Sequence, residues 1–324
     1  MALPIMAGHA ANAAGRLKED CTMALRSRYP LDPRRTGRPA PAALVETRDA
    51  IAGAVSPYTL AEGATVAKRT VGGVRCIVAS PRQPALGGMI YFHGGGYRLG
   101  GPDRMAGFLS RLAADGGCRV IAPAYALAPE NPYPAALHDA AAVIDAVAAE
   151  APDVPMMIGG DSAGGGLAAA CCIAFGESLP SLRGAVLLSP WLDLRVCADS
   201  FERCAPSDRL FSRESAQDAA NSYLQGLPAD APLASPLLAG ALDGMPSTLI
   251  IAGSAEVLIQ DSIDFAARLA AQHIGVELSV IPHMQHVSPT LFPDLPSSAR
   301  SLSAITRFMR ERLNGTGLIA DPQS

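Results

Sequence analysis

The sequence predicts an α/β domain with a mostly parallel central sheet of about eight strands flanked by helices. Two observations lead to this fold class. Strand-like and helix-like segments alternate along most of the 324 residues, and repeated β–α units are typical of parallel sheets. Hydrophobic residues make up 49% of the chain and aromatic residues only 5%, so Ala, Val, Leu and Ile are expected to build the core, which suits helices packed on such a sheet.

The individual elements follow from their hydrophobic patterns. A hairpin is predicted first, with strands over 65–71 and 74–80 joined by Gly72 and Gly73. The remaining strands are short apolar segments, and the helices between them are longer and either amphipathic or apolar throughout. These strands are expected at 88–92, 119–123, 155–160, 183–191, 248–253 and 276–282, and the helices at 105–114, 136–150, 167–175, 257–272 and 298–313.

Two segments depart from the alternation of strands and helices. Residues 1 to about 55 are rich in Ala and Arg, and prolines break their helical patches. Residues from about 193 to 236 contain no convincing strand and carry scattered charge and proline. We therefore expect a single domain over 1–324, in which these two segments form a helical cap over a core of about 63–192 and 237–315.

Charge and cysteine content narrow the function classes. The formal net charge is −4 and lysine occurs only at Lys18 and Lys68, so no nucleic-acid surface is expected. No apolar stretch is long enough to span a bilayer, and the N-terminus lacks the pattern of a signal peptide. The seven cysteines are odd in number and form no C-x-x-C pair, which favours reduced thiols and a cytoplasmic location.

The strongest local signal is the G-x-S-x-G pentapeptide Gly160-Asp161-Ser162-Ala163-Gly164. It lies between an apolar strand and an apolar helix, the context in which such a serine is a nucleophile on a sharp turn. The glycines fit because a tight strand-to-helix turn leaves little space beside the serine. A phosphate-binding loop would require G-K-[ST], but no lysine occurs at or after this position.

A second glycine cluster follows the strand at 88–92. His93 precedes three consecutive glycines and Tyr97. Backbone N–H groups of such a loop can turn toward one point and stabilise the oxyanion of a tetrahedral intermediate. The N–H of Ala163, directly after the predicted nucleophile, is expected to be a further donor. His93 is expected to hold the loop and not to transfer protons, because it belongs to a strand–loop element of its own.

The general base is expected late in the chain, because a nucleophile turn of this kind is followed by the acid and then by the histidine. The candidates after Ser162 are His273, His283 and His286. His273 lies at the end of an amphipathic helix and is expected on the surface. His283 and His286 both follow the strand at 276–282, where a base belongs. An H-x-x-H pair can also ligate metal, but no third ligand is apparent, so no metal site is expected.

The acid should follow the strand at 248–253. Glu256 is the first carboxylate after that strand, and a glutamate can orient and stabilise an imidazolium as well as an aspartate can. Asp261 and Asp264 fall inside the following helix, so they are expected to be solvated.

Taken together, these segments resemble the hormone-sensitive lipase family, the bacterial family IV carboxylesterases. The glycine cluster matches the H-G-G-G-x-x-x-G signature of that family, and the serine motif matches its G-D-S-A-G-G nucleophile motif. The resemblance extends over nearly the whole chain from about Gly63. The similar segments are HGGGYRLGG at 93–101, YALAPENPYPAAL at 125–137, GDSAGG at 160–165, SPWLDL at 189–194 and SAEVLIQDS at 254–262.

The resemblance implies an α/β-hydrolase fold with a helical cap, no cofactor, and a carboxylesterase acting on small short-acyl esters through an acyl-enzyme. It also suggests homodimers formed at a sheet edge. His286 fits the position of the family's histidine, two residues after Met284 in P-x-M-x-H, which favours it over His283. Carried over, the catalytic residues are Ser162, Glu256 and His286, the oxyanion hole is Gly94, Gly95 and Ala163, and the loop support is His93 and Gly96.

Three positions depart from the family pattern. Ala124 and Ala126 replace the usual Asp and Arg around the Y-x-L-A-P-E segment, and Gly166 stands where many members have Asn. The first two changes are expected to remove structural polar contacts and to affect local rigidity more than activity.

Other functions share these residues. A lactone hydrolase and a deacetylase or amidase acting on a specialised metabolite would use the same catalytic groups. A non-catalytic small-molecule receptor is a rival from another class, because the gibberellin receptors resemble this family but lack the catalytic histidine. Serine, acid and histidine are all present here, which weighs against a receptor.

Overall fold

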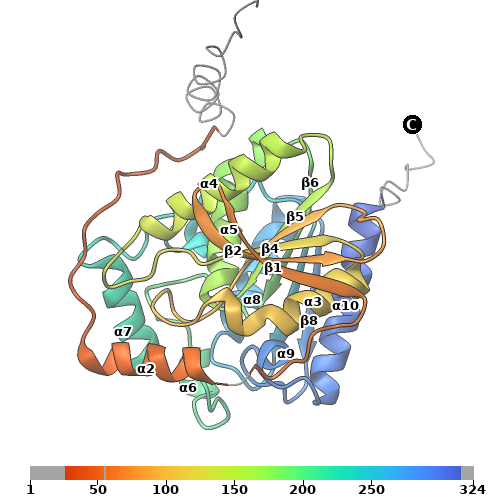
Figure 1. Ribbon diagram of the computed structural model, residues 1–324. Coiled ribbons are helices and arrows are strands. Elements are labelled where there is room, and N and C mark those ends of the chain that lie inside the picture. Colours follow the sequence, from red (N-terminus) through yellow and green to blue (C-terminus); the bar gives the residue numbers. More distant parts are fainter. Residues whose placement is uncertain (1–25, 55, 315–324) are drawn as a thin grey trace, which may run out of the picture.

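Eight strands form one sheet in the computed structural model, which describes residues 26–54 and 56–314 (Figure 1). The strand order is β1-β2-β4-β3-β5-β6-β7-β8, and all strands from β4 to β8 run parallel, whereas β1 and β2 are antiparallel to their neighbours. The predicted fold class is confirmed. The strands are β1 (Ala64–Val71), β2 (Val74–Pro81), β3 (Gly88–Phe92), β4 (Arg119–Pro123), β5 (Met156–Asp161), β6 (Leu182–Leu188), β7 (Thr248–Gly253) and β8 (Val276–Ile281).

The predicted hairpin forms with the predicted two-residue turn. Val71 pairs with Val74, and Gly72 and Gly73 between them have φ values of 55° and 78°. Two consecutive residues with positive φ suit the right-handed twist of the flanking strands, which explains the glycine pair.

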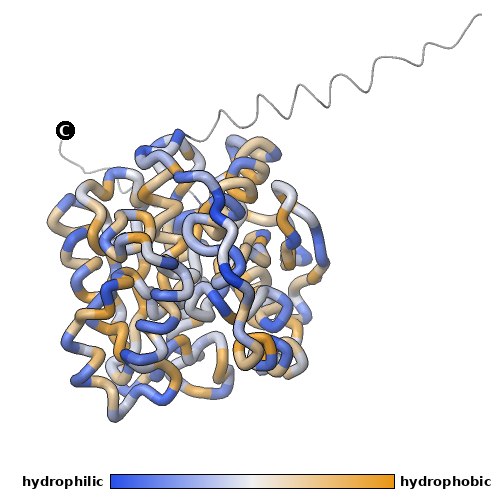
Figure 2. The backbone as a smooth tube through the Cα atoms, turned by 90° about the vertical axis from the view of Figure 1, so that its left-hand side faces the viewer, coloured by the Kyte–Doolittle hydropathy of each residue, from blue (hydrophilic) through white to orange (hydrophobic). Residues whose placement is uncertain are grey.

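Helices cover both faces of the sheet, and each face has its own hydrophobic core. Helices α3 (Ala106–Gly116) and α10 (Pro296–Leu313) pack on one face, with Leu109 and Phe308 in the core beneath them. Figure 2 shows hydrophobic and hydrophilic residues alternating along much of the chain, as expected where elements bury one side and expose the other. The other face carries α4 (Ala135–Glu150), α5 (Ala163–Phe175) and α8 (Ile259–Ala271).

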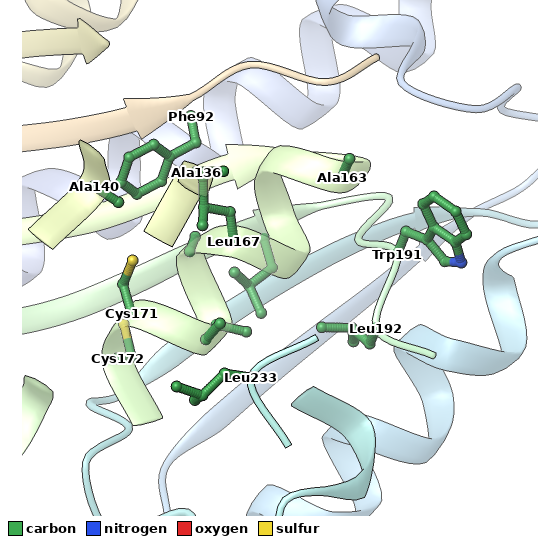
Figure 3. Packing of buried hydrophobic residues seen from close by; sticks show 14 of the residues in the cluster. Phe92, Ala136, Ala140, Ala163, Leu167, Cys171, Cys172, Trp191, Leu192 and Leu233 are labelled. Carbon is green, nitrogen blue, oxygen red and sulfur yellow. The ribbon is translucent and has the colours of Figure 1, made fainter. Parts of the chain in front are cut away.

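Helix α5 is buried over its entire length, as its apolar sequence predicts. Its Leu167 and Cys171 lie among Phe92 of β3, Ala136 of α4 and other side chains of the same core (Figure 3). Since α5 begins directly after Ser162, this packing fixes the helix end that carries the predicted nucleophile.

Short helices lie beside the sheet at the end where Ser162 is found. Helix α2 (Ala42–Gly53) has no buried residue, and α6 (Ser200–Arg203) and α7 (Arg213–Leu224) come from the strand-free segment after β6 (Figure 1). Arg48 attaches α2 to the rest of the chain, because its guanidinium pairs with Glu130 at 2.6 Å and donates to the Ala128 carbonyl at 2.6 Å. The division into core and cap stays a prediction, and its residues 1–25, 55 and 315 lie outside the described ranges.

Two further sequence predictions concern membranes and thiols. Within 26–54 and 56–314, no helix combines the length and apolar character needed to cross a membrane. The cysteines of the described ranges, at positions 76, 118, 171, 172, 197 and 204, are free thiols, and Cys21 lies outside those ranges.

Candidate active site

Ser162 lies at the turn between β5 and α5, with φ 53° and ψ −122°. This is a strained backbone conformation for a residue with a side chain. The neighbouring backbone is close on both sides: a Cβ at Gly160 would lie 2.3 Å from the Gly164 carbonyl oxygen, and one at Gly164 would lie 2.1 Å from that of Phe92. Only glycine fits these two positions, so the turn requires the spacing that the sequence shows.

The turn directs the Ser162 hydroxyl toward a histidine from the far end of the chain. Nε2 of His286 lies 2.9 Å from Oγ of Ser162, and both residues are buried. His286 belongs to the loop after β8, which continues into the short helix α9 (Ser288–Leu291). Of the other candidates for the base, His283 and His273 are exposed. The structure therefore brings His286 to the serine and leaves the other two at the surface.

Glu256 completes the group from the turn after β7. Its Oε2 lies 3.5 Å from Nδ1 of His286, and its side chain is fully buried. The distance is that of an ion pair and exceeds that of a hydrogen bond, and such contacts often shorten only when charge develops on the imidazole. Asp264 is exposed, as expected. The prediction that Asp261 is solvated is wrong: it is buried and accepts hydrogen bonds from the N–H groups of Leu192 and Asp193 at 2.9 and 3.0 Å.

Ser189, at the end of β6, is a polar contact that the sequence analysis missed. Its hydroxyl donates to Oε2 of Glu256 at 2.6 Å and accepts from the N–H of Val287 at 3.2 Å. Ser189 thus connects the turn that carries Glu256 with the loop that carries His286. The only signal in the sequence is its place at the start of the SPWLDL segment, which by itself says nothing of this contact.

The electrostatic surroundings of His286 favour its protonated form. Burial lowers the pKa of the imidazole, but the negative charge of Glu256 at 3.5 Å, together with the charges of Asp208 and Asp161, outweighs burial and raises the pKa above its usual value. An imidazole in such surroundings is a stronger base than a free one, and its cation is stabilised as it forms.

The glycine loop after β3 lies against Ser162. The Gly94 N–H donates to Oδ2 of Asp161 at 3.1 Å, while Gly95 has a φ of 120° and its N–H donates no hydrogen bond found among residues 26–54 and 56–314. The Ala163 N–H is at the first position of α5, where no intrahelical acceptor exists. Two of the three predicted donors are therefore available for an anion, and the third is bound to a neighbouring carboxyl group.

His93 and Asp161 both contact this loop at Gly94. The buried His93 ring stacks on Tyr125 with a centroid distance of 4.3 Å, and its Nδ1–H donates to the Gly94 carbonyl at 2.7 Å. Burial lowers the pKa of His93 to about 4, so the ring is neutral. Burial also raises the pKa of Asp161 to about 7. The predicted loop residue Gly96 has a φ of 60°, and its backbone lies against Ala219 of α7.

The structure shows the surroundings of two residues that depart from the family pattern, Gly166 and Ala126. At Gly166 a Cβ would lie 2.3 Å from the Trp191 carbonyl oxygen, so this backbone leaves no room for a side chain. Where Ala126 provides no guanidinium, its N–H donates to Asp139 at 2.7 Å, and Arg34 pairs with the same carboxylate at 2.5 Å.

A cavity of about 350 Å³ opens beside the Ser162 hydroxyl. The glycine loop, Ser162 and His286 line it together with residues from the two strand-free segments. Apolar side chains line most of the remaining wall, namely Ile51, Pro57, Met105, Leu210, Phe211, Val287 and Leu291. Within the described residues, no cluster of three or more His, Cys, Asp or Glu side chains is arranged to hold a metal ion.

Comparison with known proteins identifies the family of this fold. Residues 89–290 match a family model described as alpha/beta hydrolase fold. An acetyl-hydrolase of Streptomyces hygroscopicus is 35% identical over 234 residues, which cover 71% of this chain and 77% of that protein. An esterase of Acinetobacter venetianus is 31% identical over 242 residues, covering 73% of this chain and 78% of that protein.

Solved structures of esterases are also similar to this chain in fold and sequence. The crystal structure of EstE7, described as a homologue of hormone-sensitive lipase from a metagenome library, has a TM-score of 0.78 and 33% identity, covering 83% of this chain and 93% of that one. EstE5, whose crystal was soaked with p-nitrophenyl butyrate, has a TM-score of 0.77 and 29% identity, covering 95% and 99% of the two chains.

Proposed function

The chain belongs to the hormone-sensitive lipase family of α/β-hydrolases and is a serine hydrolase of carboxylic esters, and we propose that it cleaves short-acyl esters with Ser162 as nucleophile, His286 as base and Glu256 as acid. The observation that carries this proposal is the 2.9 Å contact between Nε2 of His286 and Oγ of Ser162. A base within hydrogen-bonding distance of a serine hydroxyl is what activation of that hydroxyl requires.

The reaction proceeds through an acyl-enzyme. His286 accepts the hydroxyl proton while Oγ of Ser162 bonds to the ester carbonyl carbon, and Glu256 stabilises the resulting imidazolium. The bond to the alcohol oxygen then breaks, and the alcohol leaves with the proton from His286. Water attacks the acyl-enzyme in the second step and gives its proton to His286. The carboxylic acid departs as Ser162 regains that proton.

The tetrahedral oxyanion is held by backbone N–H groups at the nucleophile turn. Gly95 and Ala163 are the principal donors in this proposal, which is supported by the absence of other acceptors for them among the described residues. The N–H of Gly94 is shared between the oxyanion and Asp161. Each such donor typically contributes about 10²–10³ in rate.

The size and lining of the cavity support small, apolar acyl and alcohol groups. Its volume of about 350 Å³ is near the lower end of the roughly 300–1,000 Å³ of small-molecule pockets. The relatives named acetyl-hydrolase and ethyl acetate hydrolase also support a short acyl chain. We expect kcat/KM to fall from p-nitrophenyl acetate and butyrate to the decanoate. A γ-lactone and an acetanilide, measured in the same panel, test the lactonase and amidase alternatives by comparing their kcat/KM values with those of the esters.

The test of the nucleophile is Ser162→Ala. We expect hydrolysis of p-nitrophenyl acetate to fall to a residual rate of at most about 10³ times the uncatalysed rate. We also expect no labelling by a fluorophosphonate probe. Ser303→Ala, on the exposed side of α10, is the matched control and should behave as the wild type. Wild-type activity or labelling in the Ser162 variant would remove the basis of the proposal.

A homodimer joined at the edge of the sheet is the remaining part of the proposal. β8 is one of the two edge strands, and its Leu278 and Val280 are 38% and 40% exposed, which suits a further apolar contact. Size-exclusion chromatography with light scattering tests it, and a monomer of 33.4 kDa at all concentrations would contradict it.

A further inference from the structure

The loop between α6 and α7 contacts both chain segments that carry the charged residues of the proposed triad. We call residues 207–211 the cap loop. It belongs to the strand-free segment after β6, about 50 residues before Glu256 and 75 before His286 in the sequence. Its contacts with those two segments are made by hydrogen bonds and by one aromatic ring.

On the acid side, the cap loop holds the residues on either side of Glu256. Oδ2 of Asp208 accepts the N–H of Val257 at 2.9 Å. The Ser207 hydroxyl donates to the Ala255 carbonyl at 3.0 Å. The backbone immediately before and after Glu256 is therefore fixed by the cap loop, and with it the direction of the buried carboxylate.

Asp208 also organises the cap loop itself. Its second oxygen, Oδ1, accepts the N–H groups of Leu210 at 2.9 Å and Phe211 at 3.0 Å. The two oxygens thus bind two different chain segments. An asparagine has one acceptor oxygen and can satisfy only one of them, so this position requires a carboxylate.

On the base side, the cap loop covers His286. The Phe211 ring stacks on the imidazole with a centroid distance of 5.5 Å and an interplanar angle of 15°. The N–H of Arg209 donates to the side chain of Gln285 at 3.2 Å. Because Oδ1 of Asp208 binds the Phe211 N–H, the same carboxylate fixes the place of this ring.

We propose that Asp208 is a positioning residue for ester hydrolysis: through Val257 and Phe211 it holds Glu256 and His286 in the arrangement that serves Ser162. The proposal rests on the proposed function of the triad. Asp208 acts without touching the ester, since its oxygens are bound to backbone N–H groups.

The charge of Asp208 has an additional effect that a purely structural residue would not have. The carboxyl groups facing the imidazole are Glu256 from the turn after β7, Asp161 from the end of β5 and Asp208 from the cap loop. Each raises the pKa of His286. Removal of the Asp208 charge therefore lowers that pKa, and the acidic limb of the pH–rate profile moves to lower pH.

The experiment compares Asp208→Asn with Asp230→Asn in the full-length protein. Asp230 is exposed, belongs to the same strand-free segment, and makes none of the hydrogen bonds or ion pairs found among the described residues. For Asp208→Asn we expect kcat on p-nitrophenyl acetate to fall about 10- to 100-fold, because a small misplacement of catalytic groups has such an effect. KM should change by less than about threefold, and the acidic limb should move to lower pH. Asp230→Asn should change none of these values.

Two further variants complete the test. Asp208→Glu keeps the charge and both oxygens. Its acidic limb should therefore lie at the wild-type pH, and its kcat should lie between those of Asp208→Asn and the wild type. If Asp208→Asn does not fold, as judged by circular dichroism and thermal unfolding, Ser207→Ala decides. It removes only the hydroxyl bonds to the Ala255 and Cys204 carbonyls and should lower kcat several-fold.

The proposal is overturned if folded Asp208→Asn keeps kcat within twofold and leaves the limb unmoved, or if Ser207→Ala in its place has wild-type kcat. Ser162→Ala, measured in parallel, separates the two ideas. When that variant is inactive and the Asp208 variant is not, only the positioning role fails, whereas an active Ser162 variant contradicts the proposed function itself.

Discussion

The proposed nucleophile Ser162 and the proposed base His286 line one cavity, but the chain builds the turn that carries Ser162 and the pair formed by His286 and Glu256 differently. Five consecutive residues, 160–164, form the turn; its conformation follows from two glycines packed closely on neighbouring backbone and from a buried helix. Glu256 and His286 depend on Ser189 and on the cap loop for their contacts. The turn is therefore a local structure that the fold holds rigidly, whereas the pair is a long-range assembly that distant substitutions can disturb.

Replacing His286, the proposed base, is expected to lower activity more than any other change. His286→Ala leaves the nucleophile turn intact but removes the group that activates it, so kcat should fall at least about 10⁴-fold, or roughly 5.5 kcal/mol of barrier. Steady-state hydrolysis of p-nitrophenyl acetate measures it. His283→Ala, three residues earlier and exposed, is the matched control and should keep kcat within twofold. A reversal between the two variants would assign the role of base to His283.

Replacing Glu256, the proposed acid, should have the next largest effect on activity. Glu256→Gln keeps the size of the side chain but removes the charge that stabilises the imidazolium, so kcat should fall about 10³-fold, or roughly 4 kcal/mol. Asp261→Asn is the control, because this carboxyl group binds the N–H groups of Leu192 and Asp193 away from the imidazole. Its variant should lose thermal stability while kcat changes less than about tenfold. A large kcat loss in Asp261→Asn alone would move the acid to that residue.

The turn can be broken by a single methyl group. In Gly164→Ala the new Cβ would meet the carbonyl oxygens of Phe92 and His93 at 2.1 and 2.5 Å, and backbone atoms cannot move aside as a side chain can. We expect a loss of about 3 kcal/mol in the free energy of unfolding, which corresponds to roughly 4–5 °C in Tm for a chain of this length. Gly240→Ala, where no atom lies within 4 Å of the added Cβ, should leave Tm within about 2 °C. Equal Tm values for the two variants would show that the turn is not sterically fixed.

The same contrast explains what the sequence could predict. The strands, the hairpin at Gly72 and Gly73 and the strand–turn–helix at Ser162 follow from patterns within a few residues, and the structure contains all of them. Proximity of Glu256 and His286 was predicted from chain order. Their supports were not, because contacts made by Ser189 and Asp208 join segments about 50 to 100 residues apart and leave no local pattern.

The error at Asp261 has the same physical cause. A carboxylate in an amphipathic helix is usually solvated, and the local pattern gives no reason to expect otherwise. Here the segment after β6 places two backbone N–H groups over the start of α8, and the carboxylate satisfies both. Likewise, the sequence could not reveal that the Gly94 N–H donates to Asp161, since that bond depends on how two loops approach each other.

The smallest expected effect is a shift in the pH dependence of activity, which tests the pair formed by Glu256 and His286. In its proposed role His286 can accept a proton only when neutral, so kcat/KM should rise with pH as the imidazole loses its proton. Because the neighbouring carboxylates raise the pKa of His286, the protonated form persists to higher pH, and the midpoint of the acidic limb should lie above pH 6.5, the usual value for an imidazole. In Glu256→Gln the largest of these carboxylate influences is lost, so the midpoint measured on the residual activity should move to lower pH.

The control for this pH dependence is Asp161→Asn, because burial raises the pKa of Asp161 to about 7, in the same range. An acidic limb that persists in this variant belongs to His286. If the limb disappears, it belongs to Asp161.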